Sequence, residues 1–268
     1  MSQITILLLY LLAAAAFTAS RLPRYGTRSR PLFVVATIAA ATGIVVHGEA
    51  LFSLVFQSDG FDLTIGNVIS MIGFELAIVS LIAGLEPTLR GISGGLALLA
   101  SLTVLLMGPS ADALTGTGLA WQVRSHILIA MLSYGLLTVG TIVAVYALVQ
   151  ERRLHAAKLS PVNQLFAPLE TTEKLLFGVA AAGFAGLTLA IVSGLSFVDD
   201  LVEQHLAHKF GLSLLAWMIF GVLLAGRYFR GWRGKRAVRL YLGGFAVLCL
   251  AYFGSRLILE EIFNSSWS

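Results

Sequence analysis

The chain has 268 residues, of which 57% are apolar and only 12% are charged, and its mean hydropathy is +0.87. A soluble domain carries about 25% charged residues, so this composition excludes an ordinary soluble protein and predicts an integral membrane protein. The net charge is +4, but nearly every cation lies beside the end of an apolar run, where membrane topology explains it. We therefore expect membrane lipids as partners and no nucleic acid.

Eight apolar runs have about the length that a membrane-spanning helix needs. A span takes about 20 residues, because a helix rises about 1.5 Å per residue across roughly 30 Å of hydrocarbon. The runs cover residues 3–20, 31–56, 64–84, 92–108, 126–149, 174–196, 211–228 and 239–257. They predict an all-α integral membrane protein with eight transmembrane helices in a single polytopic domain, residues 1–268. The only cysteine, Cys249, excludes an intramolecular disulfide and a thiolate zinc site.

The first run, "ITILLLYLLAAAAFTAS", has two interpretations. Its small residues would suit cleavage of a signal peptide. However, the arginines follow the apolar run, whereas a signal peptide carries its cations before it. We therefore expect this run to be retained as a span.

The cations predict the orientation of the chain. Alternate connections hold 15 of the 18 Lys and Arg residues, including the segment "RGWRGKR" at residues 230–236. Cytoplasmic connections are enriched in Lys and Arg, so these connections are expected in the cytoplasm and both termini on the periplasmic side.

Histidines are distributed unevenly with respect to these spans. An ionisable side chain inside a span costs about 2.5–3.5 kcal/mol on insertion, so it is first interpreted as functional. His155 is expected in a cytoplasmic loop, whereas the other four lie at or just beneath the outer face. These four are His47, His126, His205 and His208.

The histidine cluster is consistent with haem binding. Haem needs one or two imidazoles on the iron, apolar walls, and cations for its propionates. Arg124, Lys209 and Arg256 are expected at the same face. A zinc site that uses the acidic residues near His205 remains an alternative, although the spacing matches no compact zinc motif. Taken singly, each histidine is also compatible with an interfacial hydrogen-bonding role.

Two acidic residues leave a transporter open as a weaker alternative. Glu49 and Glu75 lie within predicted spans, and Glu75 is either a protonated packing residue or part of a proton or substrate path. Small residues four apart in the sixth span, Gly178, Ala182 and Gly186, predict close helix packing.

Specific motifs appear in the carboxyl-terminal half. A span containing Leu-Ala-Trp precedes the Gly-Trp-Arg-Gly loop, and the last span ends in Tyr-Phe-Gly-Ser-Arg at residues 252–256. In these motifs the chain resembles the YpjD/HemX-like inner-membrane proteins of the CcsA/CcmC cytochrome c assembly superfamily. The resemblance covers the eight-span layout, with specific motifs over residues 120–257.

The resemblance implies a bacterial inner-membrane protein with haem as its cofactor at the outer face. His126 occupies the position of the first outer-face haem histidine of CcsA-like proteins. The chain departs from the family in three respects: "VEQHLAHKFGLSLLAW" lacks the tryptophan-rich stretch, no histidine follows the last span, and Ala225 replaces a histidine before the loop. We therefore expect no enzymatic haem lyase activity.

The leading hypothesis is a haem-binding chaperone or accessory factor associated with cytochrome c assembly. His126 would be one axial ligand, His47, His205 or His208 the second, and Arg124 or Arg256 would bind propionates. Other cytochrome c assembly or haem-biosynthesis proteins would be its partners. The alternative is a scaffold or regulatory subunit, with HemX-like regulation of haem biosynthesis, that has lost haem binding.

Overall fold

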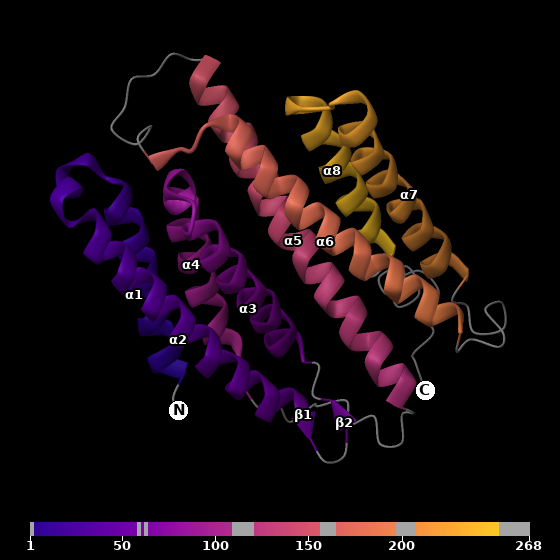
Figure 1. Cartoon of the computed structure of the whole chain (residues 1–268). Coiled ribbons are helices and arrows are strands. Elements are labelled where there is room, and N and C mark those ends of the chain that lie inside the picture. Colours follow the sequence, from indigo (N-terminus) through magenta and orange to yellow (C-terminus); the bar gives the residue numbers. More distant parts are fainter. Residues whose placement is uncertain are drawn as a thin grey trace. The chain divides into compact units, whose positions relative to one another are not determined.

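The computed structural model of the chain describes residues 3–57, 60–61, 64–108, 121–155, 165–196 and 207–251 (Figure 1). This part of the chain is almost entirely helical. Its α-helices are α1 (Gln3–Arg21), α2 (Ser29–Val55), α3 (Ile65–Gly84), α4 (Arg90–Thr103), α5 (Trp121–His155), α6 (Leu169–Leu195), α7 (Ala207–Arg230) and α8 (Gly234–Cys249). Directly after α2, the two-residue strands β1 (Phe56–Gln57) and β2 (Gly60–Phe61) pair antiparallel.

Within the described residues, seven of these helices are long and apolar enough to cross a membrane: α1 to α7, where α2 and α4 are extended by short 3-10 turns. The chain is therefore a multi-pass membrane protein. The helix α8 has 16 residues, and the predicted eighth span, 239–257, runs beyond the part of the chain that is described. The eighth crossing thus stays a prediction.

The largest departure from the predicted bounds is α5. The apolar run predicts a span over residues 126–149, whereas the helix covers Trp121–His155. Hydropathy detects only the part that suits hydrocarbon, but glutamine, glutamate and arginine at the two ends are good helix formers. At 35 residues the helix is about 52 Å long, so it extends beyond a hydrocarbon layer of about 30 Å.

The chain divides into two compact units. The first comprises Met1–Ala120 and Val149–Leu175, and therefore contains α1 to α4. The second comprises Trp121–Leu148 and Leu176–Ser268, and contains most of α5 and α6 together with α7 and α8. Each unit is described by itself below.

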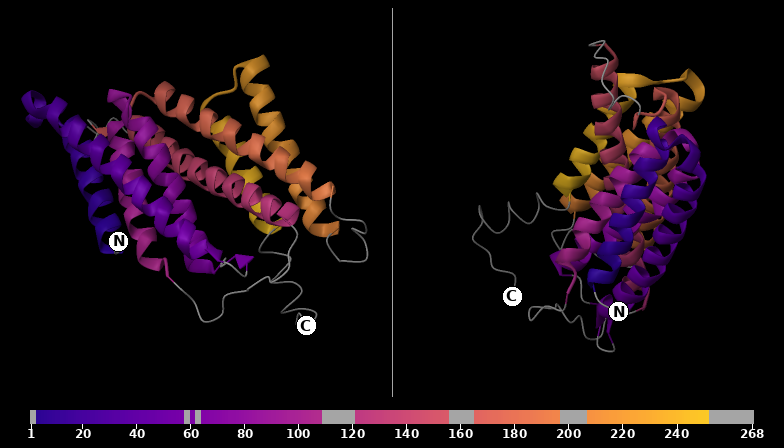
Figure 2. Two further views of the ribbon diagram at one scale, coloured as in Figure 1. Left: turned by 60° about the horizontal axis from the view of Figure 1, so that its bottom comes forward. Right: turned by 90° about the vertical axis from the view of Figure 1, so that its left-hand side faces the viewer.

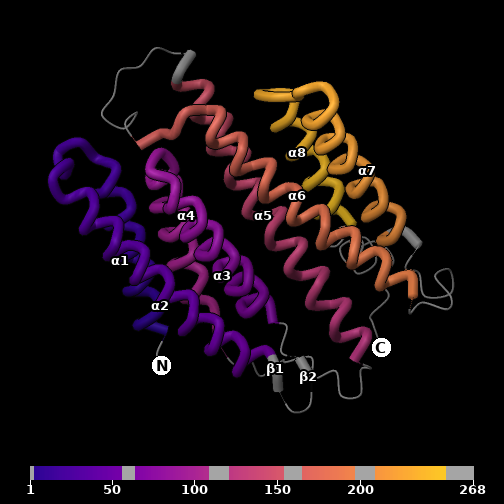
Figure 3. Tube along the Cα trace, viewed as in Figure 1, coloured from indigo at the N-terminus to yellow at the C-terminus, as the bar shows by residue number. Residues whose placement is uncertain are grey.

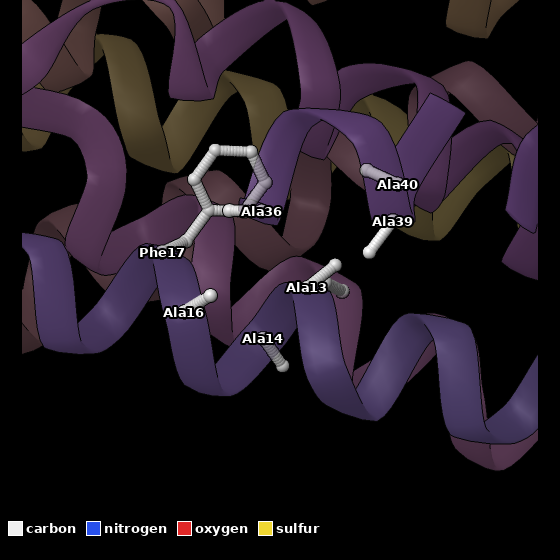
Figure 4. Close-up of a cluster of buried hydrophobic side chains, with 8 residues drawn as sticks. Ala13, Ala14, Ala16, Phe17, Ala36, Ala39 and Ala40 are labelled. Carbon is white, nitrogen blue, oxygen red and sulfur yellow. The ribbon is translucent and has the colours of Figure 1, made fainter. Parts of the chain in front are cut away.

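Small side chains hold the first unit together. In Figure 4, Ala13 and Phe17 of α1 lie close to Ala36 and Ala39 of α2 in a shared buried cluster. Because alanine has only a methyl side chain, the two backbones approach closely, as helices in a bilayer commonly do. The views of Figure 2 show α1 and α2 side by side, and α4 packs against both α1 and α3.

Substitution of Gly94 on α4 tests this packing. A Cβ atom at Gly94 would collide with the Thr18 hydroxyl and lie 2.9 Å from the Ala14 carbonyl oxygen, both on α1. We expect Gly94→Ala to lower the stability of the purified protein by about 1–3 kcal/mol, the usual cost of overpacking. The neighbouring Gly95 has nothing within 4 Å of its added Cβ, so Gly95→Ala is the matched control. Equal melting temperatures for the two variants would contradict this packing.

In the second unit, hydrogen bonds fix the register of the helices. The Ser133 hydroxyl on α5 donates to the Gly183 carbonyl on α6 at 2.8 Å, and the Trp217 indole on α7 donates to Thr188 on α6 at 2.9 Å. The Tyr241 hydroxyl on α8 donates to the Leu137 carbonyl on α5 at 2.9 Å. Figure 3 traces α6 and α7 as neighbouring helices of opposite direction.

The packing glycines of α6 differ in part from those predicted. Gly186 packs against Ser133 as expected, but Gly178 and Ala182 are exposed. Gly183 meets Leu137 instead. Four-residue spacing identified a row of small residues on α6. It did not determine which side of α6 packs against α5.

Candidate functional site

His126 lies near the start of α5 and is held from α6. Its Nδ1 atom is 2.9 Å from the Ser193 hydroxyl, and that hydroxyl donates to the Ala190 carbonyl at 3.0 Å. Since a hydroxyl has one proton, a Ser193 that donates to Ala190 accepts from His126, which corresponds to the tautomer with the proton on Nδ1. In this tautomer the lone pair on Nε2 is left for a ligand.

The sequence places His126 on the side of α5 that packs against α6. Ser133 and Leu137 follow it at intervals of seven and four residues, which puts all three on one side of the helix. Across the interface, a Cβ atom at Gly194 would lie 3.0 Å from His126 Cε1. A glycine at this position therefore leaves the space that the half-buried imidazole occupies.

This arrangement fits the coordination chemistry of haem iron. A histidine that binds a metal usually donates its other ring N–H to a fixed acceptor, which sets the tautomer and the ring orientation. Ser193 supplies that acceptor for His126. The imidazole is half-buried where α5 meets α6.

Arg124 lies on another side of α5. Residues two positions apart on a helix do not face each other, so the Arg124 side chain leaves the helix in a different direction from His126. It is half-buried, whereas Trp121 at the start of the helix is 72% exposed. An interaction of Arg124 with a ligand on His126 would therefore rely on the length of its side chain.

Of the remaining predicted site residues in the second unit, only His208 falls within the described helices. It is in the first turn of α7, nine residues or about 14 Å before Trp217. Because Trp217 bonds to Thr188, and Gly194 is six residues or about 9 Å beyond Thr188, the His208 backbone lies at the same end of this unit as His126. His205 and Arg256 lie outside the described residues.

His47 belongs to the first unit and has a different environment. Its Nδ1 lies 3.1 Å from the Tyr10 hydroxyl, and its Nε2 lies 2.8 Å from the Ser70 hydroxyl. The imidazole has no exposed surface, and the rings of Tyr10 and Phe74 meet it edge-on with centroids 5.7 Å away. Both ring nitrogens are thus used in bonds that tie α2 to α1 and α3, and in this arrangement neither is available to iron.

Sequence reasoning missed the partners of both histidines. Tyr10 and Ser70 are 37 and 23 residues from His47, and Ser193 is 67 residues from His126. The only available signal was indirect, because a buried histidine in a span must find hydrogen-bonding partners.

Glu75 is a second buried ionisable group in the first unit. Its side chain is 4% exposed, and its Oε2 atom has no hydrogen-bond partner among the described residues. Among the described residues, no group of three or more His, Cys, Asp or Glu could hold a metal ion. The acidic residues of the zinc alternative, Asp199, Asp200 and Glu203, lie outside the described part of the chain.

Comparison with known proteins identifies the family. The family described as cytochrome C assembly protein matches residues 4–263. This chain belongs to that family. The family member is 30% identical over 233 residues to the inner membrane protein YpjD of Escherichia coli K12, which covers 85% of this chain and 88% of that protein.

CcsA proteins are more distant relatives of this family member. The chain is 25% identical over 159 residues to the cytochrome c biogenesis protein CcsA of Guillardia theta, covering 53% of each chain. It is 28% identical over 113 residues to CcsA of Microcystis aeruginosa, covering 41% of this chain and 34% of that protein. No solved structure gives a significant match. The protein is thus a CcsA- and YpjD-like membrane member of the family.

Proposed function

We propose that this protein binds haem and hands it on as a non-enzymatic chaperone or accessory factor in cytochrome c assembly. The observation that carries the proposal is the pairing of His126 with Ser193, which fixes the imidazole and leaves Nε2 for iron. The family and its CcsA relatives support the same ligand, because haem is the group that cytochrome c assembly must handle.

The residues would divide the work as follows. His126 on α5 would hold the iron, His208 in α7 or His205 shortly before it in the sequence would supply a second imidazole, and Arg124 or Arg256 would meet a propionate. Haem would be the cargo, and carrying it would require no chemical reaction catalysed by the protein. Ala225, where CcsA-like proteins carry a histidine, supports binding without lyase activity.

An absorption spectrum of the protein purified from haem-replete cells tests this function. We expect a sharp Soret band and split visible bands after reduction, as for iron with two imidazole ligands. Well-folded protein without these bands would overturn the haem-binding proposal.

A scaffold or regulatory subunit without haem is the second candidate function. It is favoured by His47, whose nitrogens are both used in helix packing, so one of the four outer-face histidines already has a structural role. In this case the colourless protein would still be recovered with a haem-biosynthesis or cytochrome c assembly protein after crosslinking in membranes.

We also propose that the protein resides in the bacterial inner membrane with both termini in the periplasm. In the first unit, the Arg90 guanidinium at the start of α4 lies 4.1 Å from the Phe33 ring centroid near the start of α2. The cation-bearing connections α1–α2 and α3–α4 therefore share one end of this unit, as the positive-inside rule requires.

Cysteine labelling tests this orientation. In a Cys249→Ala background, Thr27→Cys lies in the α1–α2 connection and Ser53→Cys near the opposite end of α2, both at exposed positions. A membrane-impermeant maleimide is expected to label Ser53→Cys in intact spheroplasts and Thr27→Cys only after permeabilisation. The reverse pattern would place the termini in the cytoplasm.

A further inference from the structure

The connection between α7 and α8 is short and has a defined conformation. Only residues 231–233 separate the two helices. Gly231 and Gly234 adopt φ values of +64° and +60°, which glycine tolerates without strain. The Gly231 amide donates to the Arg227 carbonyl at 3.1 Å and so caps the end of α7.

Trp232 is clamped inside this connection. Its indole ring covers Gly226 on α7, where a Cβ atom would collide with the ring. The Arg236 guanidinium lies 3.9 Å from the ring centroid, and Arg227 Nη1 donates to the Trp232 carbonyl at 3.3 Å. The cations around Trp232 therefore belong to a segment with a defined conformation. The positive-inside rule requires only that the cations are present, so it does not account for this conformation.

The surface of this segment combines exposed cations with exposed aromatic rings. No Asp or Glu occurs anywhere from residue 204 to residue 259, so neither helix nor the connection carries a carboxylate to neutralise the cations. Tyr228 and Phe229 are 85% and 79% exposed, with their ring centroids 5.0 Å apart. The exposed arginines are Arg230, Arg233, Arg236 and Arg239.

We propose that the α7–α8 connection is a binding site for the headgroups of anionic phospholipids. Guanidinium groups bind phosphate through paired N–H donors, and Tyr and Phe rings beside them suit the boundary between headgroups and hydrocarbon. Arg230, Arg233 and Arg239 would contact phosphate, while Tyr228 and Phe229 enter the acyl boundary. This site is independent of haem and of the proposed function.

Binding of phosphatidylglycerol to the full-length protein in phosphatidylcholine nanodiscs tests the proposal. The triple variant Arg230→Gln, Arg233→Gln and Arg239→Gln is expected to bind phosphatidylglycerol roughly 100-fold more weakly, because each arginine near an anionic surface contributes about fivefold. The matched control removes three exposed cations elsewhere, by Arg24→Gln, Arg28→Gln and Arg30→Gln. We expect less than a threefold change for this control.

A second pair of variants tests the geometry at constant charge. Gly226→Ala displaces Trp232 and is expected to weaken binding severalfold, whereas Gly243→Ala on α8, with open space around its Cβ, leaves it unchanged. Equal losses in the two triple variants would overturn the site in favour of general surface charge. A second result would also overturn the proposal. If millimolar inorganic phosphate weakened phosphatidylglycerol binding as much as the first triple variant does, the site would be one for free phosphate. If Gly226→Ala does not fold, the comparison of the triple variants decides alone.

Discussion

Replacement of His126 by alanine is expected to remove most of the haem that copurifies with the wild-type protein. The side chain supplies the only imidazole nitrogen that the described structure shows both oriented and left open for iron. Ser193→Ala removes the acceptor that fixes the ring, and the loss of such a partner typically lowers metal affinity by about 10- to 100-fold. The measurement is the Soret absorbance per mole of protein.

A matched histidine on the same helix provides the control. His155 ends α5, 29 residues or about 44 Å along the helix from His126. His155→Ala is expected to retain full haem content. If His126→Ala remained folded and kept its Soret band, another residue would be the ligand.

The second large effect is expected for stability, on replacement of His47 by alanine. The substitution leaves the hydroxyls of Tyr10 and Ser70 buried without their partner, and a buried polar group without a partner costs about 1–3 kcal/mol. The cavity left by the imidazole adds to this loss. Thermal unfolding of the purified protein should show a clear drop in melting temperature, while the haem content of the folded fraction stays unchanged.

The hydroxyl of Tyr10 offers a graded comparison. Tyr10→Phe removes one hydrogen bond and keeps the ring against Gly43, so it should cost only about 0.6 kcal/mol, as single bonds between membrane helices do on average. If His47→Ala instead lost haem at an unchanged melting temperature, His47 would be a ligand and the hydrogen-bonded arrangement would be wrong.

Much of the fold follows from the sequence because a bilayer imposes length and polarity on every span. The predicted run 3–20 corresponds to α1 at Gln3–Arg21, and 64–84 corresponds to α3 at Ile65–Gly84. The ends of α5 were not predicted, since polar residues continue a helix beyond the hydrocarbon without a change in hydrophobic pattern. The contact faces of α6 were also missed in part, because identical spacing of small residues is compatible with more than one neighbour.

The candidate site was only half visible in the sequence. His47 and His126 gave the same signal, a histidine within an apolar run. The structure distinguishes them by Nε2. In His47 this atom lies 2.8 Å from the Ser70 hydroxyl, whereas Nε2 of His126 has no such hydroxyl partner among the described residues. This difference depends on contacts across many residues, and no local pattern encodes it.

Chemical rescue of His126→Gly tests the central claim most directly. This variant removes the imidazole but leaves its space beside Gly194. We predict that the purified variant lacks the Soret band and that added imidazole, together with haem, restores the wild-type spectrum. Two results would contradict the assignment of His126 as the ligand. In one, the variant binds haem without added imidazole; in the other, the folded variant does not bind haem even when imidazole is added.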